Sequence, residues 1–284
     1  MKKSYVCQNR ATMRLKDLPF LLGIKPKTRE YGFDIVNIQL PVDGELSLAQ
    51  WQHPKAGKIG VDQGEVNELR SFLQPGDVAI DIGAYTGDTA VPMALAVGKT
   101  GKVLALEPNK YVFKVLAKNA ELVGAKGNII PLPFAATPTD SQMEFEYSDP
   151  GFCNGGFHEG ISQWKHGHVY KLAVEGKNLT NYLKQHYSEL IPSIRYIKVD
   201  AEGFDLAVLE SITEIIEKQK PYIRVEIFKH TDINYRKKLY NFLKKFGYSI
   251  HLFGGNTSYK AQPVNENDLM TWKHYDLFAV PSIV

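Results

Sequence analysis

The sequence predicts an α/β fold with a doubly wound, mostly parallel sheet. Between residues 65 and 284, short apolar runs alternate with amphipathic stretches, which is the pattern of repeated strand–helix units. One apolar run, residues 78–82, passes directly into a glycine loop, and the next, residues 102–106, is followed at once by the acidic Glu107. Right-handed crossovers lay such strands side by side, and ligands bind beyond their carboxyl ends.

The elements of this sheet follow one another in a regular order. Apolar residues at helical spacing predict a helix at residues 65–73, which Pro75 and Gly76 end. We expect strands at residues 78–82, 102–106, 128–134, 194–199, 222–227, 248–253 and 276–280, with an additional strand at residues 143–147. We expect the remaining helices at residues 88–97, 109–123, 178–186, 204–218 and 233–246. Pro92 falls near the first turn of its helix, where proline is tolerated.

Two segments do not fit this repeat. Residues 1–64 mix short apolar runs with proline and glycine, and they predict an N-terminal arm or small cap, with residues 33–40 as its best strand candidate. Residues 148–176 are rich in glycine and histidine, and long irregular loops in compact domains are usually functional or disordered. We therefore divide the chain into residues 1–64 and a domain of residues 65–284, with residues 148–176 as a long loop over its site.

The composition is typical of a globular protein that binds neither nucleic acid nor membranes. Lys and Arg exceed Asp and Glu by only 34 to 31 in 284 residues, and no basic block stands out. The short apolar stretch at residues 18–24 contains Pro19, so we expect no signal peptide and no membrane-spanning helix. The two cysteines, Cys7 and Cys153, make no disulfide framework and suit a cytoplasmic protein.

The glycine loop indicates which ligand the fold accepts. Its pattern is Asp81-x-Gly83-x-x-x-Gly87, followed by Asp88, and it lacks both the third glycine of a dinucleotide loop and the G-K-[S/T] of a P-loop. Two carboxylates would repel a pyrophosphate but suit an amino group and a sulfonium, while Glu107 can accept the hydroxyls of a ribose. These features favour S-adenosylmethionine as cofactor. An NAD-dependent oxidoreductase is the alternative that the missing glycine disfavours.

Three stretches of the chain form a combination of motifs. They are Asp81-Ile-Gly-Ala-Tyr-Thr-Gly-Asp-Thr89, Leu106-Glu-Pro-Asn109 and Ile197-Lys-Val-Asp-Ala-Glu-Gly-Phe204. Together they resemble the FkbM family of S-adenosylmethionine-dependent methyltransferases, from about residue 65 to residue 281. The resemblance implies the strand order 3-2-1-4-5-7-6 with the last strand antiparallel, and it implies oxygen as the methylated atom.

We expect the cofactor to contact three segments of this fold. The glycine loop meets its methionine portion, Glu107 binds its ribose, and small residues after the third strand line its purine. The expected cofactor-binding residues are Asp81, Gly83, Ala84, Tyr85, Gly87, Asp88, Thr89, Glu107, Pro108, Asn109, Ala135 and Ala136.

Acidic residues at the ends of the fourth and fifth strands are the candidates for chemistry. A hydroxyl acceptor loses its proton during methyl transfer, and a carboxylate, a histidine or a metal ion can take part. Asp200 is the first choice for the base and Glu202 the second, with an acidic helix cap as the alternative role of either. Glu226 and His230 are further catalytic candidates.

Glu226 is the one charge near the end of a buried strand, so it needs a partner. A pairing with Arg224, Arg195 or a backbone amide is the preferred one. Glu226 and Asp200 together could bind Mg²⁺, but two carboxylates make a poor site without a third ligand, so we expect no metal.

The glycine-rich part of the long loop is expected to cover the acceptor. The expected substrate-loop residues are Asn154, Gly155, Gly156, Phe157 and His158. The glycines would act as hinges of a flap that excludes water, and a plain hairpin turn is the alternative. A zinc site built from Cys153 with His158, His166 and His168 matches no familiar ligand spacing.

We therefore expect an S-adenosylmethionine-dependent O-methyltransferase that acts on a hydroxyl of a small molecule or glycan. A non-catalytic nucleotide-binding module of the same fold is a further alternative. Nucleic acid is disfavoured as acceptor because residues 200–203 read Asp-Ala-Glu-Gly, where base methyltransferases of this fold carry a Pro-Pro-aromatic motif. The N-terminal arm cannot build its own core, so it offers a surface through which subunits could associate.

Overall fold

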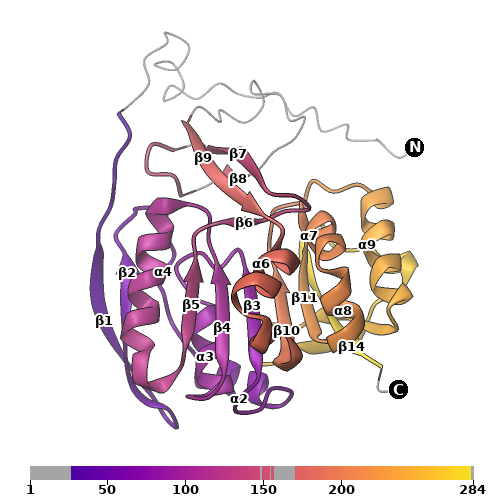
Figure 1. Ribbon diagram of the computed structural model, residues 1–284, viewed down its shortest axis with the longest axis horizontal. Coiled ribbons are helices and arrows are strands. Elements are labelled where there is room, and N and C mark those ends of the chain that lie inside the picture. Colours follow the sequence, from indigo (N-terminus) through magenta and orange to yellow (C-terminus); the bar gives the residue numbers. More distant parts are fainter. Residues whose placement is uncertain (1–26, 148, 154, 157–169, 283–284) are drawn as a thin grey trace, which may run out of the picture.

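The computed structural model describes residues 27–147, 149–153, 155–156 and 170–282, and its centre is one large twisted sheet. Its strands are β3 (Val78–Ile82), β4 (Lys102–Leu106), β5 (Ile129–Leu132), β10 (Ile194–Val199), β11 (Tyr222–Ile227), β12 (Tyr248–Phe253), β13 (Lys260–Pro263) and β14 (Tyr275–Pro281). Their order is β13-β12-β14-β11-β10-β3-β4-β5 (Figure 1). The predicted order 3-2-1-4-5-7-6 is confirmed, with β13 as an additional edge strand. The predicted antiparallel direction of the last strand is also confirmed, because β14 runs antiparallel to β11 and β12.

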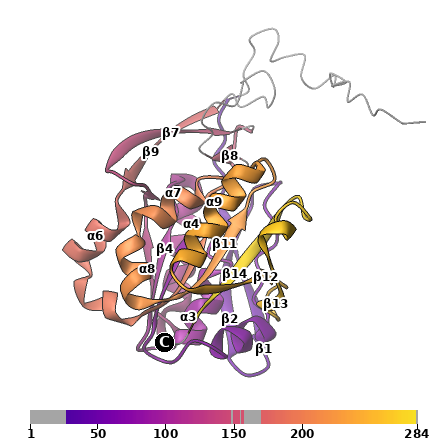
Figure 2. The same cartoon turned by 90° about the vertical axis from the view of Figure 1, so that its right-hand side faces the viewer.

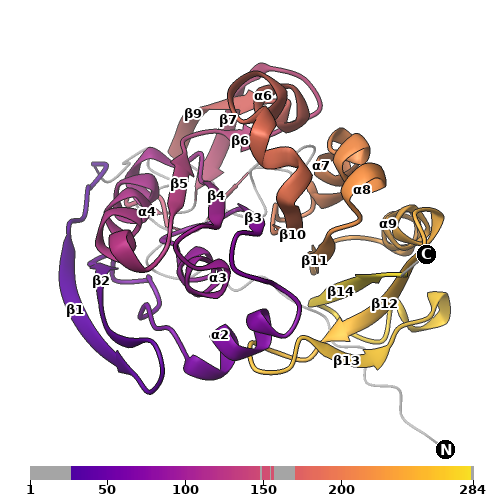
Figure 3. The same ribbon diagram turned by 60° about the horizontal axis from the view of Figure 1, so that its bottom comes forward.

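Helices cover both faces of this sheet, as Figures 1 and 3 show. One face packs against α2 (Gln63–Arg70), α3 (Ala90–Val97) and α4 (Lys110–Val123). The other packs against α6 (Leu179–His186), α7 (Asp205–Ser211), α8 (Thr213–Gln219) and α9 (Ile233–Lys245). Short 3₁₀ helices are η2 (Gly124–Lys126), η3 (Ser188–Ser193) and η4 (Glu266–Asp268). Within the described ranges, no helix is both long and apolar enough to cross a membrane.

The N-terminal region contributes a β-hairpin that packs beside α4 at one edge of the molecule (Figures 1 and 3). β1 (Phe33–Leu40) is the predicted strand, whereas its antiparallel partner β2 (Gly44–Trp51) was not predicted. Leu46 and Leu48 of β2 are buried in the core that also contains α3. The fully buried Asn119 of α4 accepts from the Ala49 amide at 2.7 Å and donates to the carbonyls of Ala49 and Thr86 at 3.1 and 2.7 Å. The hairpin is therefore tied both to α4 and to the glycine loop.

A second, four-stranded sheet lies above the carboxyl ends of the parallel strands (Figures 1 and 2). It contains β6 (Ala135–Ala136), β7 (Ser141–Tyr147), β8 (Gly155–Gly156) and β9 (Tyr170–Lys177), in the order β6-β9-β7-β8. The prediction of an irregular loop is therefore wrong for residues 170–176, where buried and exposed side chains alternate strictly along β9. Asn154, Phe157 and His158 lie outside the described residues, as do His166 and His168.

The predicted helix at residues 204–218 is also wrong in one respect, because it is two helices. α7 ends at Ser211 and α8 begins at Thr213, with the break at Ile212. The hydroxyl of Ser211 donates to the Val208 carbonyl and that of Thr213 to the Glu210 carbonyl, both at 2.7 Å. Such local bonds compete with the helical backbone pattern and bend or end a helix.

The loops after β3 and β10 touch each other through their backbones. Gly83 has a φ of +79°, and a Cβ atom placed on it would lie 2.2 Å from the carbonyl oxygen of Asp200. The Asp200 amide in turn donates to the Ile82 carbonyl at 3.0 Å. Glycine is thus required at position 83 by the neighbouring loop as well as by the backbone conformation.

Gly83→Ala is predicted to lower the free energy of unfolding by about 2–4 kcal/mol, from the unfavourable φ and the overlap with the Asp200 carbonyl. Urea unfolding followed by circular dichroism measures it. Gly60→Ala is the matched control, because its Cβ would have no atom within 4 Å. Equal stability of the two variants would contradict this description of the loop contact.

Candidate active site

A cavity of about 420 Å³ lies between the carboxyl ends of the parallel strands and the four-stranded sheet. This volume is within the range of small-molecule and cofactor sites. The predicted cofactor residues that line it are Gly83, Tyr85, Asp88, Thr89, Glu107, Pro108, Asn109, Ala135 and Ala136. Side chains that the sequence analysis had not assigned complete the wall, and they include Lys55, Phe134, Thr137, Met143, Phe145, Tyr147, Cys153, Lys198, Phe204 and Arg224.

Three predicted cofactor residues lie beneath the cavity instead of lining it. Ala84 is fully buried in the core, and Gly87, at a φ of +95°, would place a Cβ 3.1 Å from Leu116 of α4. Asp81 is also fully buried, and its Oδ2 accepts a hydrogen bond of 2.6 Å from Thr89. These residues shape the loop on which the lining residues stand.

Glu107 is held at the cavity wall by backbone amides. Its Oε2 accepts from the Tyr85 amide at 3.1 Å and its Oε1 from the Asn109 amide at 2.8 Å. Burial raises the pKa of Glu107 to about 8, although the two amides lower it. A ligand that donates hydroxyl groups to this carboxylate therefore favours its ionised form.

Lys198 connects the glycine loop to the loop after β10. Its side chain is 5% exposed, and its Nζ lies 3.3 Å from Asp81 Oδ1 and 3.4 Å from Asp200 Oδ2 and donates to the Gly83 carbonyl at 3.2 Å. Burial lowers the pKa of Lys198, but the two carboxylates outweigh burial and hold it above the ordinary value. Lys198 belongs to the motif at residues 197–204, but no role was predicted for it. In the sheet, Lys198 of β10 lies in register with Asp81 of β3.

The loop after β10 presents two of the predicted catalytic carboxylates to the cavity. Asp200 is about half exposed, and Glu202 stands exposed at the cavity mouth with a φ of +48°. Asp205, which was not predicted, organises this loop by accepting from the amides of Ala201 and Gly203 at 2.8 and 2.9 Å. Asp200 and Glu202 are thereby left facing the cavity.

Non-glycine residues with left-handed backbone gather around the cavity. Tyr85 and Glu202 line it at φ values of 48°, and Phe152, at 58°, accepts a hydrogen bond from the Asn109 side chain through its carbonyl. Such conformations cost free energy and are typical of functional sites, where surrounding contacts hold them in place.

Glu226 does not line the cavity, and its predicted pairing is wrong. Its Oε1 lies 2.6 Å from Nε2 of His274, while Arg224 bonds Asp276 at 2.7 Å. Burial first, and then the charge of Asp200, raise the pKa of Glu226. Arg195, the other predicted partner, donates to the backbone carbonyls of residues 192 and 194.

His230 also stands apart from the cavity. Its ring packs edge-on against Phe228 with centroids 5.3 Å apart. In the part of the chain that the structure describes, no three histidine, cysteine or acidic side chains come together as a metal site. The geometry therefore brings Asp200 and Glu202 to the cavity and leaves Glu226 and His230 outside it.

Lys198→Met is predicted to lower the free energy of unfolding by about 3–5 kcal/mol, because it leaves the buried Asp81 carboxylate without its cation. Urea unfolding measures the change, and Lys102→Met, at the half-buried first position of β4, is the control. The double variant Asp81→Asn/Lys198→Met should be less destabilised than the sum of its single changes. Additive effects would contradict a direct interaction.

Comparisons with known proteins identify the family to which the chain is similar. The model of the methyltransferase FkbM domain matches residues 81–250. The hexuronic acid methyltransferase AglP of Haloferax volcanii is 27% identical over 176 residues, which are 60% of this chain and 65% of that protein. A demethylmenaquinone methyltransferase of Oceanobacillus iheyensis is 26% identical over 136 residues, 45% of this chain and 52% of that protein. The chain thus spans about half to two thirds of the length of these curated relatives.

Among solved structures, the methyltransferase FkbM of Methylobacillus flagellatus aligns with a TM-score of 0.45 at 14% identity, over 72% of this chain and 44% of that one. The family match carries the assignment, because residues 81–250 are more than half of the 284-residue chain. The chain belongs to the FkbM family of S-adenosylmethionine-dependent methyltransferases.

Proposed function

We propose that this chain binds S-adenosylmethionine in the cavity and transfers its methyl group to a hydroxyl of a small molecule or glycan. The observation that carries the proposal is the Glu107 carboxylate, held by two backbone amides at the wall of a cavity beside the glycine loop. A carboxylate at the end of the second parallel strand can accept both hydroxyls of a ribose. Family membership supports the same cofactor.

The remaining walls suit the other parts of this cofactor. Pro108, Ala135 and Ala136 offer small, flat surfaces for a purine. Gly83, Asp88 and Thr89 offer backbone and acidic groups for an amino acid end that carries a positive charge. When bound, S-adenosylmethionine supplies an electrophilic methyl group on a sulfonium.

Asp200 is the residue that takes the acceptor proton in this proposal. Its carboxylate lines the cavity and lies 3.4 Å from the Lys198 ammonium. The next residue, Ala201, donates its amide to Asp205, which fixes the backbone of this loop. The Asp200 carboxylate would accept the hydroxyl proton of the acceptor, and the cofactor would supply the methyl group through the break of its carbon–sulfur bond, which would leave S-adenosylhomocysteine. Phe145, Tyr147 and Phe204 contribute apolar surface to the cavity, and exclusion of water from such a site favours methyl transfer.

The choice of oxygen and of a sugar-like acceptor rests on similarity. One curated relative is named a hexuronic acid methyltransferase, which supports a hydroxylated sugar derivative as acceptor. Another relative is named for a quinone, so the relatives alone do not fix the acceptor of this chain. Two measurements, S-adenosylhomocysteine binding and methyl transfer to an acceptor, separate this proposal from an NAD-dependent oxidoreductase and from a module that binds without turnover.

Binding of S-adenosylhomocysteine is predicted to strengthen as the pH rises from about 6 to 8. The pKa of Glu107 is raised to about 8 in the free protein, and hydroxyl donors lower it, so a proton is released on binding below that pH. Calorimetry at pH 7 in two buffers of different ionisation enthalpy measures the release. Glu107→Gln should abolish it and weaken binding about tenfold or more. A pH-independent affinity would contradict the ribose assignment.

Asp200→Asn is predicted to keep S-adenosylhomocysteine affinity within about threefold and to lower kcat about 100-fold or more. The assay measures transfer of radioactive methyl groups to a panel of hydroxylated sugars and metabolites. Glu217→Gln, on the exposed side of α8, is the matched control and should leave both quantities unchanged. Unaltered turnover in Asp200→Asn would show that another group accepts the proton.

A further inference from the structure

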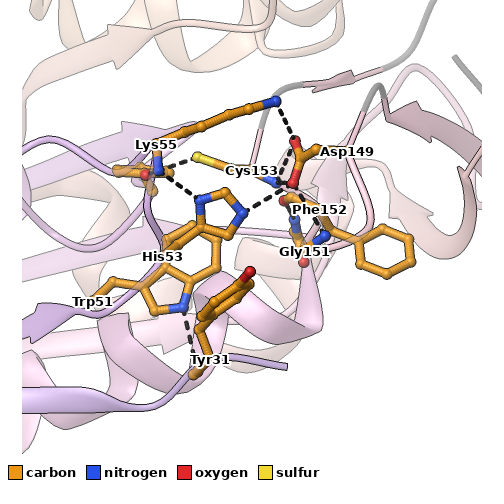
Figure 4. Close-up of polar contacts among 10 residues, drawn as sticks. Tyr31, Trp51, His53, Lys55, Asp149, Gly151, Phe152 and Cys153 are labelled. Atoms are coloured by element: carbon orange, nitrogen blue, oxygen red, sulfur yellow. Dashed lines mark hydrogen bonds and ion pairs between the residues drawn. The ribbon is translucent and has the colours of Figure 1, made fainter. Parts of the chain in front are cut away.

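Outside the glycine loop, a buried polar cluster borders the cavity, and Figure 4 shows it in close-up. At its centre the Asp149 carboxylate lies 2.9 Å from His53 Nε2 and accepts from the amides of Gly151 and Cys153 at 3.1 and 3.2 Å. The Lys55 amide donates to His53 Nδ1 at 3.0 Å, so Nε2 carries the proton that His53 shares with Asp149. We call these five residues the Asp149 cluster.

The cluster joins two segments that are distant in sequence. The rings of Trp51 and Tyr31 pack on His53 with centroids 4.8 and 4.7 Å away, and His53 is buried. A Cβ on Gly151 would lie 2.4 Å from His53 Nε2, so the turn and the histidine are in direct contact. The N-terminal segment is therefore fixed against the turn of residues 149–153.

This cluster forms part of the cavity wall. Lys55 and Cys153 both line the cavity, and the Cys153 sulfur lies 3.5 Å from the hydroxyl of Tyr85, which lines it as well. Lys55 lies before the family match, which begins at residue 81. An N-terminal side chain thus reaches a site whose other contacts come from the methyltransferase domain.

The basic residues that line the cavity differ in their pairing. Lys198 lies between two carboxylates, and Arg224 is bonded to Asp276. The Lys55 side chain is half exposed, and its ammonium forms an ion pair with Asp149 Oδ2 at 3.7 Å, which is longer than a hydrogen bond. Asp149 is already bonded by His53 and by backbone amides, so Lys55 can bind an anion without leaving a buried carboxylate unpartnered.

We propose that Lys55 binds a carboxylate of the methyl acceptor, so that the acceptor is a hydroxy acid such as a sugar acid. This inference rests on the proposed methyl transfer to a hydroxyl. Asp200 and Glu202, which also line the cavity, would repel an acidic group at the reacting end, whereas the Lys55 ammonium attracts such a group. The fixed His53 and Asp149 hold Lys55 in place, so this cation also orients the acceptor.

The test compares two acceptors that differ only at C6, p-nitrophenyl β-glucuronide, which carries a carboxylate there, and p-nitrophenyl β-glucoside, which carries a hydroxymethyl group. The measured quantity is kcat/KM for methyl transfer, with S-adenosylhomocysteine affinity and thermal unfolding recorded in parallel. We expect the unsubstituted protein to favour the glucuronide about tenfold or more. Lys55→Met should bring the ratio close to one, Lys55→Arg should retain a preference, and the exposed neighbour variant Lys58→Met should keep the full ratio.

The outcomes separate this inference from the proposed function. The role of Lys55 is overturned if S-adenosylhomocysteine binds but the two sugars are methylated equally or not at all. It is also overturned if Lys55→Met keeps the ratio of the two kcat/KM values. If S-adenosylhomocysteine does not bind, the proposed function itself fails. A ratio lost in Lys55→Met and kept in Lys58→Met, with both variants folded, supports the inference.

Discussion

The site depends on the ion pairs that the Lys198 ammonium forms with Asp81 and Asp200. The ammonium carries a positive charge into the carboxyl edge of the sheet, where Asp81, Asp200 and the Gly83 carbonyl surround it. An unpaired charge in a buried site costs free energy, so the buried Lys198 and Asp81 each need an oppositely charged partner. The ion pairs hold the loops after β3 and β10 together, and the missing Cβ of Gly83 lets their backbones meet. The position of Asp200 at the cavity follows from this contact.

The rest of the site is built around that fixed edge. The loop of Tyr85 supplies one of the two amides that hold Glu107, and Asn109 connects Glu107 to the turn that bears Cys153. The four-stranded sheet closes the cavity from above, and the hairpin fixes α4 and the glycine loop from the side (Figure 1). Polar groups of the glycine loop and of the loop after β10 thus line one part of the cavity, and the apolar side chains of Phe145 and Tyr147 line another. Such an arrangement favours positioning of the reactants and exclusion of water.

The sequence was sufficient for the central sheet, and nine of the twelve residues predicted to bind the cofactor line the cavity. The bounds of β3, β4, β10, β11 and β12 match the predicted strands, because these largely buried strands are mostly apolar in sequence. β2 and β9 were not predicted because each lies in a segment rich in glycine, with proline or histidine, although buried and exposed side chains alternate along β9. The pairing of Lys198 with Asp81 and of His53 with Asp149 depends on strand register and on chain segments 96 residues apart, which spacing does not reveal.

The most direct test of this account is a crystal structure of the protein with S-adenosylhomocysteine. The account predicts the ribose hydroxyls on the Glu107 carboxylate, the purine between Pro108 and Ala135–Ala136, and the sulfur facing Asp200. A ligand bound elsewhere, or bound in this cavity with its ribose away from Glu107, would contradict it.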